Sequence, residues 1–431
     1  MYFDKLAEIL NLINDYLYSN ILVFMLIFTG VFFSFYLAFP QLHIKNIFKI
    51  LLNKPKEKNL SSYEAFLISS GAKIGVGNII GVSIAISTGG SGAIFWMWVF
   101  AFFGAASAFC ESTLAQIYKR KDDKKYYGGV AFYIKYGLGL NTLAICFAIF
   151  LILADIVGFN ALLGFSIKNH LDFKYSEILI TLVAAFIFFN GISFGKKIVP
   201  FMIVSYLLLA LYVFIRYFDL NVILQIFYNA FNLNSAGGGL LGSVIVIGAK
   251  RGLFSNEAGM GSAPNVAASV ECAHPCEQGF VQSFSVLMDL LVCTASAVFV
   301  LFAKGNYEIN EAFRFYFGNF GSFILSFFII LFCLTSFYGN YYYSKANLLF
   351  ITQRKTALII FNIIAILCVF MGTLAELKFV WNLADFLMFF TTIINLIAIF
   401  MLRKLVLKSI KNYKSNKDFK ELNTSNTPAW N

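Results

Sequence analysis

Long apolar runs separated by short polar segments occupy most of the chain, from residue 21 to residue 402. A helix needs about 20 apolar residues to cross a bilayer, and most of these runs are that long. The pattern therefore predicts an all-α polytopic membrane protein with about eleven transmembrane helices. The predicted spans cover residues 21–39, 62–88, 92–118, 142–167, 177–193, 198–216, 239–268, 279–303, 320–344, 356–373 and 379–402.

The two ends of the chain have a different pattern. Residues 1–20 alternate apolar positions with Asp4, Glu8 and Asp15 at helical spacing, which predicts a helix lying in the membrane interface. The tail at residues 404–431 is basic and then polar, and we expect it to be cytoplasmic and disordered.

Two polar, glycine-rich segments interrupt the apolar pattern. One is GAKIGVGNIIG at residues 71–81, and the other is RGLFSNEAGMGSAP at residues 251–264. Glycine tolerates backbone conformations that other residues resist, and Pro264 has no N–H to continue a helix. Unwound backbone survives at membrane depth only when protein or a watery cavity surrounds it. We therefore predict two broken helices whose breaks form a binding site near the middle of the membrane.

The positions of the two breaks divide the chain into similar halves. Residues 62–217 and 239–403 each hold five predicted spans, and each half begins with a broken helix. Repeats with an odd number of spans cross the membrane in opposite directions, so we expect a five-plus-five inverted repeat. Residues 1–61 add one extra transmembrane helix and a basic loop, and residues 218–238 form an extracellular connection.

Composition and charge support this class. Hydrophobic residues make up 59% of the chain, charged residues only 13%, and mean hydropathy is +0.76. The net charge of +11 is explained without nucleic acid, because basic residues accumulate in cytoplasmic loops. The segments predicted to be cytoplasmic hold 23 Lys and Arg and the outer segments 7. This imbalance predicts an outside N-terminus and an inside C-terminus.

Three basic residues fall in or beside the breaks, where charge is costly. They are Lys73, Lys250 and Arg251, and Glu257 is the expected counter-charge. Charges within a membrane usually mark functional sites, so Lys73, Arg251 and Glu257 are candidates for an ion pair or a gate. The alternative is that they only hold the broken helices together. Asp155 is a further acidic residue with apolar neighbours on both sides.

The chemistry of a helix break indicates what it binds. The half-helix after each break offers free N–H groups to a carboxylate, and freed carbonyls suit Na⁺ or an ammonium group. An amino acid carried with Na⁺ fits both the free N–H groups and the freed carbonyls. The adjacent hydroxyls of Thr335 and Ser336 are candidates to complete a sodium site, unless they bond to their own helix. With only three His and no nucleophile motif, the sequence does not indicate an enzyme.

Four stretches resemble one transporter family. They are GVGN at Gly75–Asn78, GGSGAIFWMW at Gly89–Trp98, GLFSNEAGMGSAP at Gly252–Pro264 and VWNLAD at Val380–Asp385. These stretches look like those of the alanine or glycine:cation symporter family, over about residues 20–405. The resemblance implies the fold of the leucine-transporter type and sodium-coupled uptake of small neutral amino acids, chiefly alanine and glycine, across the cytoplasmic membrane of a prokaryote. Na⁺ is the implied coupling ion, with no organic cofactor.

The resemblance also implies roles for individual residues. The substrate carboxylate is expected at the backbone of Gly75, Val76 and Gly77. The substrate pocket is expected to include Phe254, Ser255, Asn256 and Gly259, with Asn78 beside it and Trp381 closing one side. One Na⁺ is expected at the carbonyls of Gly71 and Ile74 and the hydroxyls of Thr335 and Ser336.

Two departures from the family pattern bear on the substrate. Many members have Thr where this chain has Val76, and a Gln of their third core helix has no counterpart in residues 155–161. Gly158 is expected to open space there, and Asp155 to add charge. The alternative function is therefore a proton-coupled symporter or exchanger of a different amino acid on the same fold.

Overall fold

The computed structural model is almost entirely helical. It describes residues 2–43, 45, 47–53, 59–122, 125–171, 173–190, 192–231, 243–303, 308–415, 419 and 428–430. Within that part of the chain, eight helices are long and apolar enough to cross a membrane, and a bent pair makes a possible ninth. The protein is thus an all-α polytopic membrane protein, as predicted, while the count of eleven spans stays a prediction.

Long helices occupy most of the predicted spans. The first half of the chain contains α1 (Tyr2–Leu17), α2 (Val23–Tyr36), α3 (Ile47–Leu52), α4 (Ser62–Lys73), α5 (Val82–Gly89), α6 (Gly92–Ile117), β1 (Arg120–Asp122), β2 (Lys125–Tyr127), α7 (Val130–Leu138), α8 (Asn141–Ile152), α9 (Asn160–Lys168), α10 (Ser176–Asn190) and α11 (Ile192–Tyr217). The second half contains α12 (Leu220–Phe231), α13 (Ser243–Asn256), α14 (Pro264–Ala267), α15 (Pro275–Leu301), α16 (Ile309–Phe317), α17 (Phe320–Ile351), α18 (Lys355–Thr373), α19 (Leu377–Met401) and α20 (Arg403–Lys414). Wider π-helical turns join some of them, including η1 (Tyr18–Leu22), η4 (Gly77–Gly81) and η5 (Leu153–Phe159).

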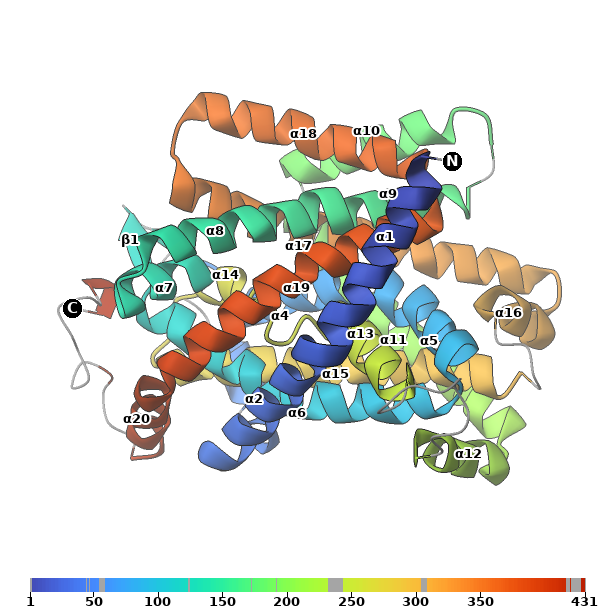
Figure 1. The fold of residues 1–431 in the computed structure, drawn as a ribbon, viewed down its shortest axis with the longest axis horizontal. Coiled ribbons are helices and arrows are strands. Elements are labelled where there is room, and N and C mark those ends of the chain that lie inside the picture. The colour runs from blue at the N-terminus through green and yellow to red at the C-terminus, as the bar shows by residue number, and fades with distance from the viewer. Residues whose placement is uncertain are drawn as a thin grey trace.

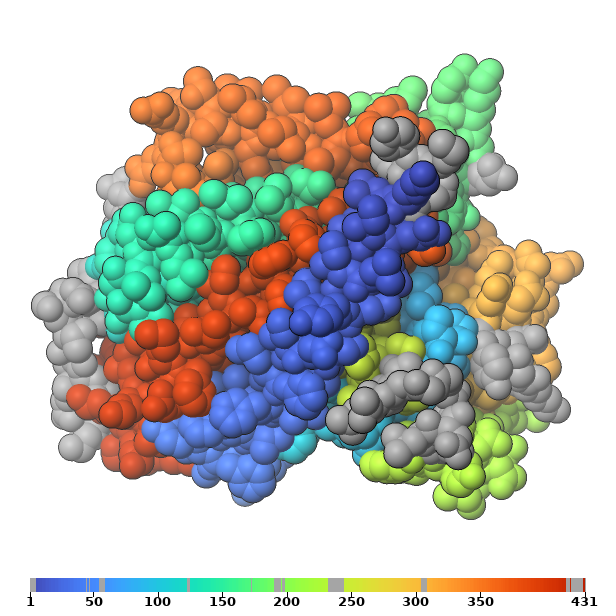
Figure 2. All heavy atoms as spheres, in the orientation of Figure 1, coloured from blue at the N-terminus to red at the C-terminus, as the bar shows by residue number. Residues whose placement is uncertain are grey.

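The N-terminal segment differs from its prediction. In place of an interfacial helix followed by a separate span, α1, η1 and α2 form one continuous helix over Lys5–Tyr36. It crosses one face of the molecule with α1 beside α19 (Figures 1 and 2). Asn14 donates to the Asn382 carbonyl at 2.8 Å, and Tyr18 donates to the Asp385 carbonyl at 2.9 Å. Both side chains are buried, so their polar contacts fix α1 to the protein instead of to the lipid interface.

The loop elements separate to two ends of the molecule. Figure 1 shows β1, α20 and the C-terminus at one end and α12 and α16 at the other. These are the segments predicted to be cytoplasmic and outer, respectively. The structure contains no membrane, so the assignment of sides remains a prediction.

The tail is more ordered than predicted. Residues 403–414 form α20, in which buried Val406 and Ile410 face the protein. The indole of Trp430 donates to the Gln116 carbonyl at 2.8 Å, at the C-terminal end of α6. A tail that was expected to be disordered therefore contacts the helical body at two places.

Candidate functional site

The first predicted break lies between α4 and α5. The α4 helix begins with a capping box between Ser61 and Glu64 and ends at Lys73, and the axis bends by 51° before η4 and α5 continue. The Gly75 N–H leaves the helical pattern and donates to the Asn78 side-chain oxygen at 2.9 Å. A Cβ at Gly75 would lie 2.6 Å from the Ser336 hydroxyl, so only glycine fits so close to α17.

The second predicted break lies between α13 and α14. It begins at Glu257, which has the left-handed φ of +53° that usually requires glycine, and continues through Gly259 and Gly261 at +86° and +90°. Pro264 then starts the short helix α14 at its first position. A non-glycine residue held in this conformation costs of order 1 kcal/mol, and such residues concentrate at functional sites.

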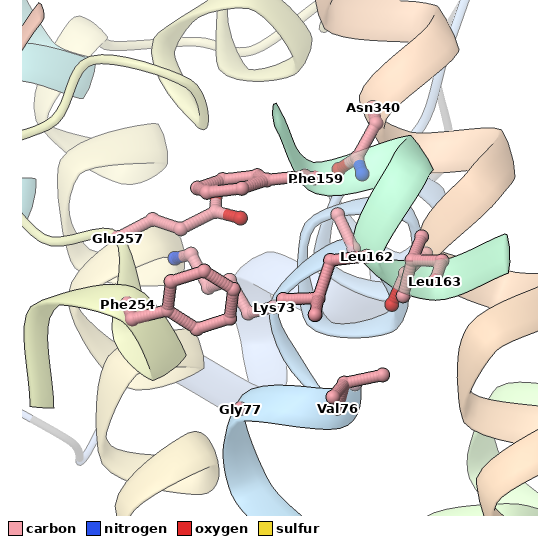
Figure 3. Close-up of a pocket in the computed structure, with 12 residues that line it drawn as sticks. Lys73, Val76, Gly77, Phe159, Leu162, Leu163, Phe254, Glu257 and Asn340 are labelled. Atoms are coloured by element: carbon pink, nitrogen blue, oxygen red, sulfur yellow. The ribbon is translucent and has the colours of Figure 1, made fainter. Parts of the chain in front are cut away.

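A small cavity of about 20 Å³, with room for about one water molecule, lies where the two breaks meet. Figure 3 shows that the side chains around it come from both broken helices, from α9 and from α17. Its lining residues are Ala72, Lys73, Gly75, Val76, Gly77, Phe159, Leu162, Leu163, Phe254, Glu257, Ser336 and Asn340. The two interruptions, 182 positions apart between Gly75 and Glu257, therefore share one cavity.

Opposite charges line this cavity without forming an ion pair. Lys73 and Glu257 are each 3% exposed, and both point into the space between Phe159 and Phe254 (Figure 3). Within the described residues, the Lys73 ammonium donates to the Ser285 hydroxyl at 3.5 Å, and Glu257 accepts from the Ser262 hydroxyl. A buried ion without a counter-ion is costly, so both charges are available to a ligand that carries the two complementary charges.

Arg251 and Lys250 pair with a different acid from the one predicted. The Arg251 guanidinium contacts the Asp385 carboxylate at 2.5 Å, and the Lys250 ammonium lies 3.5 Å from both Asp385 and Asp15. The prediction that Glu257 is their counter-charge was therefore wrong, because α13 turns these two side chains toward α19 and α1. Glu257 instead follows the end of α13 and enters the cavity.

Trp381 lies between this charge cluster and the cavity. Its ring centre is 4.5 Å from that of Phe254, and the Arg251 guanidinium lies 4.5 Å from the Trp381 ring. At 5% exposure it is no residue of an interfacial aromatic belt. Phe254 lines the cavity and Trp381 packs against Phe254 from outside the lining, so its role in closing the pocket stays a prediction.

The predicted sodium ligands are only partly together. The Ser336 hydroxyl donates to the Gly71 carbonyl at 3.1 Å, so α17 reaches the end of α4. The Thr335 hydroxyl bonds to its own helix, at the Phe332 carbonyl (2.9 Å), which is the alternative considered for these hydroxyls. Gly71 and Thr335 also line a second, smaller space of about 10 Å³ beside α11. Ile74 is fully buried at the first break.

Six predicted pocket residues lie outside the cavity lining: Trp381, Gly158 and four residues near the two breaks, Asn78, Ser255, Asn256 and Gly259. Asn78 and Ser255 bind the two oxygens of the Asp289 carboxylate at 2.6 and 2.8 Å, so α15 links the two breaks. The Asn256 side chain accepts from the Ala258 N–H at 2.9 Å, and the Gly259 carbonyl accepts from Asn395 at 2.8 Å.

Gly158 does not open space. A Cβ at this position would lie 3.0 Å from the Ala384 Cα, because η5 packs directly against α19. The expectation of a larger pocket at Gly158 was therefore wrong. Asp155, one turn earlier, is fully buried and accepts from the Ser344 hydroxyl at 3.2 Å, away from the cavity lining.

Five lining residues were missed in the sequence: Ala72, Phe159, Leu162, Leu163 and Asn340. Phe159, Leu162 and Leu163 are apolar residues in an apolar stretch, where the sequence offers no signal, whereas Ala72 lies within the first predicted break. Asn340 had a signal, because it follows Ser336 by four residues and so lies on the same face of α17.

Comparison with known proteins identifies the family. The family model described as "Sodium:alanine symporter family" matches residues 3–427. The chain belongs to the sodium:alanine symporter family. It is 39% identical to the amino-acid carrier protein AlsT of Bacillus subtilis, over 94% of this chain and 92% of that protein. It is 36% identical to the probable sodium/glutamine symporter GlnT of the same species, over 96% and 91%. It is 32% identical to the sodium/alanine symporter AgcS of Methanococcus maripaludis, over 94% and 97%.

Membership of the sodium:alanine symporter family fixes the class of activity. The protein is a cation-coupled amino-acid symporter in a membrane and not an enzyme. In such a symporter, a cavity with opposite charges between two helix breaks is the expected place for a zwitterion.

Proposed function

We propose that this protein uses an inward sodium gradient to carry small neutral amino acids, alanine and glycine first, into the cell. One observation carries the proposal: Lys73 and Glu257 bring opposite, unpaired charges into a cavity at the unwound backbone of Gly75–Gly77. A free amino acid has a carboxylate and an ammonium group a few ångströms apart, so it neutralises both residues at once.

The proposed orientation of the substrate follows from the charges. Its carboxylate lies at the Gly75, Val76 and Gly77 backbone, at the start of the second half-helix, on the side of Lys73. Its ammonium group lies toward Glu257. Phe254 and Val76 also line the cavity and give it apolar surface.

Na⁺ is proposed to bind beside Ser336. The oxygens of Ser336 and Gly71 are already in contact, and rotation of the hydroxyl hydrogen frees the Ser336 lone pairs for a cation. The carbonyl of Ile74 and the hydroxyl of Thr335 complete the proposed ligand set, the latter after it leaves the Phe332 carbonyl. Hard cations prefer such oxygen ligands.

The cluster of Arg251, Asp385 and Lys250 is proposed as the outer gate, with Trp381 and Phe254 beneath it. This proposal includes the predicted architecture: inverted repeats at residues 62–217 and 239–403, an outside N-terminus and an inside C-terminus, in the cytoplasmic membrane of a prokaryote. The two breaks meeting at one cavity support it.

Uptake into proteoliposomes tests the function. Purified protein is reconstituted alone, and accumulation of radiolabelled L-alanine or glycine is followed under an inward Na⁺ gradient, an inward H⁺ gradient, or neither. Accumulation driven by Na⁺ alone is expected. Glu257→Gln and Lys73→Met should each abolish it, because each leaves one end of the zwitterion without a partner.

A proton-coupled symporter or exchanger is the second candidate. Asp155 favours it, since one oxygen of this fully buried carboxyl accepts from the Ser344 hydroxyl and the other has no hydrogen-bond partner in the described part of the chain. Uptake driven only by the H⁺ gradient, and lost in Asp155→Asn, would replace sodium coupling with proton coupling.

A further inference from the structure

The face of α17 that borders the cavity has polar residues at every fourth position. Ser336, Asn340 and Ser344 follow one another at this spacing, and their partners are the Gly71 carbonyl, Asn160 and Asp155. Of the three, Ser336 and Asn340 line the cavity. Ser336 contacts the backbone at the first break, so Asn340 lies one helical turn, about 6 Å, farther from the proposed position of the substrate backbone.

Asn340 and Asn160 leave one donor and one acceptor unused. The Asn340 amide donates to the Asn160 oxygen at 3.1 Å, and the two residues are 2% and 0% exposed. The other half of each amide, the Asn340 oxygen and the Asn160 nitrogen, bonds to no described residue. If both amides were turned over, the pair would still retain one free donor and one free acceptor.

Among the residues that line the cavity, Asn340 is the one with a fully buried side-chain atom that has no hydrogen-bond partner in the described part of the chain. Each buried polar group without a partner costs about 1–3 kcal/mol, so most such groups in proteins are satisfied. The neighbouring lining residues Phe159, Leu162 and Leu163 have apolar side chains and supply no partner. Figure 3 shows Asn340 on the far side of Leu162 and Leu163 from the Val76 and Gly77 backbone.

We infer that Asn340, which lines the cavity and is held by Asn160 behind it, forms a side-chain subsite for amino acids whose side chain can donate a hydrogen bond to the Asn340 oxygen. The matching side chains are hydroxyls and carboxamides: serine, threonine, asparagine and glutamine. A carboxylate brings only acceptors and an alkyl group brings neither, so both leave a polar group unpaired. This inference rests on the proposed function, because it assumes that the cavity binds an amino acid.

Isosteric competitors test the subsite in the unmodified protein. Threonine and valine have nearly the same shape, as do asparagine and leucine, but only one of each pair can donate and accept. Inhibition of Na⁺-driven L-alanine uptake is measured for all four. Threonine and asparagine are expected to inhibit at concentrations at least about tenfold lower than valine and leucine, since a site that binds a polar group discriminates against its apolar analogue.

The variant Asn340→Leu tests whether Asn340 causes this discrimination between polar and apolar side chains. This variant keeps the size of the side chain. It should bring the ratio of inhibitory concentrations within each pair close to one, mainly by raising the apparent KM for threonine. Tyr341→Phe is the matched control, because it removes a hydrogen bond from the same helix, to Asn362 on α18, and should leave the ratios unchanged. The melting temperature of the unmodified protein with each competitor gives a second readout that needs no variant, and threonine should raise it more than valine.

Failure of the inference is distinct from failure of the proposed function. Na⁺-driven alanine uptake with equal inhibition by the members of each pair would overturn the subsite alone. Retained discrimination in Asn340→Leu would also overturn it. Absence of Na⁺-driven uptake of every amino acid would overturn the proposed function, and with it the subsite.

Discussion

Neutralising Asp385 tests whether the cluster of Arg251, Asp385 and Lys250 is a gate to the cavity. Asp385 is fully buried, and it is the carboxylate in contact with the Arg251 guanidinium, which is 8% exposed. Asp385→Asn keeps the shape of the side chain but leaves a buried guanidinium without its counter-ion. Removing one partner of a buried pair costs about 3–5 kcal/mol. We expect a value near the lower end, because Asp15 still lies 3.5 Å from Lys250 and compensates part of the charge.

A double-mutant cycle measures this coupling. Asp385→Asn and Arg251→Met are each expected to lower stability in SDS-driven unfolding, whereas the double variant, which removes both charges, should recover much of the loss. The expected coupling energy is about 3 kcal/mol. The exposed pair Arg314 and Glu311 is the control, with an expected coupling below about 1 kcal/mol. A coupling of less than about 0.5 kcal/mol at Arg251 and Asp385 would show that the two residues act independently.

If the cluster of Arg251, Asp385 and Lys250 is a gate, breaking it should open the cavity to reagents from outside. A purely structural ion pair would not have this effect. A cysteine placed at Val76, in the lining of the cavity, should react slowly with a membrane-impermeant thiol reagent added from outside while the cluster is intact. In the Asp385→Asn background, its reaction rate should rise at least about tenfold at a temperature where the protein remains folded. Lower stability without faster labelling would refute the gate and leave a structural role.

Three further predictions address other parts of the structure. Ser336→Ala should weaken the dependence of uptake on Na⁺ concentration much more than Thr335→Ala, because only the Ser336 hydroxyl reaches α4. Gly158→Ala should lower stability by about 1–3 kcal/mol in SDS-driven unfolding, because the added methyl group meets the backbone of α19, whereas Gly195→Ala, with open space around it, should be neutral. Burial lowers the pKa of His274 below its ordinary value of about 6.5, and its neutral ring caps α15 by accepting from the Cys276 N–H. The stability that this cap contributes should therefore be complete above about pH 6.5 and decline as the pH falls through the lowered pKa, whereas His274→Asn, which also caps, should melt without this pH dependence.

The sequence predicted the fold well because the hydrophobic pattern of a membrane helix is strong. Helices α6, α15 and α19 each begin within four residues of their predicted spans. The terminal segments were predicted less well. The helical spacing of charges in residues 1–20 fits an interfacial helix, but Asn14 and Tyr18 are buried against α19, and sequence spacing alone does not reveal a partner so distant.

The candidate site was predictable where backbone chemistry determines it. Gly75, Gly77, Phe254 and Glu257 line one cavity because glycine and strained backbone mark both breaks. The choice of partners was not predictable. Arg251 and Glu257 lie six positions apart, yet the end of α13 separates them, so that one contacts α19 and the other enters the cavity.

The contacts of α1 impose an order on the assembly of the protein. The polar side chains of α1 and η1, Asn14 and Tyr18, are made long before their partners on α19. These partners, Asn382 and Asp385, lie 368 and 367 positions later in the chain. Until then, Asn14 and Tyr18 face lipid, other early helices or water, and none of these supplies the two carbonyls that they bind in the finished protein. The helix α1 thus reaches its final packing only after α19 has been made. Until α19 has been made, the growing chain holds the side chains of Asn14 and Tyr18 without their final hydrogen-bond partners.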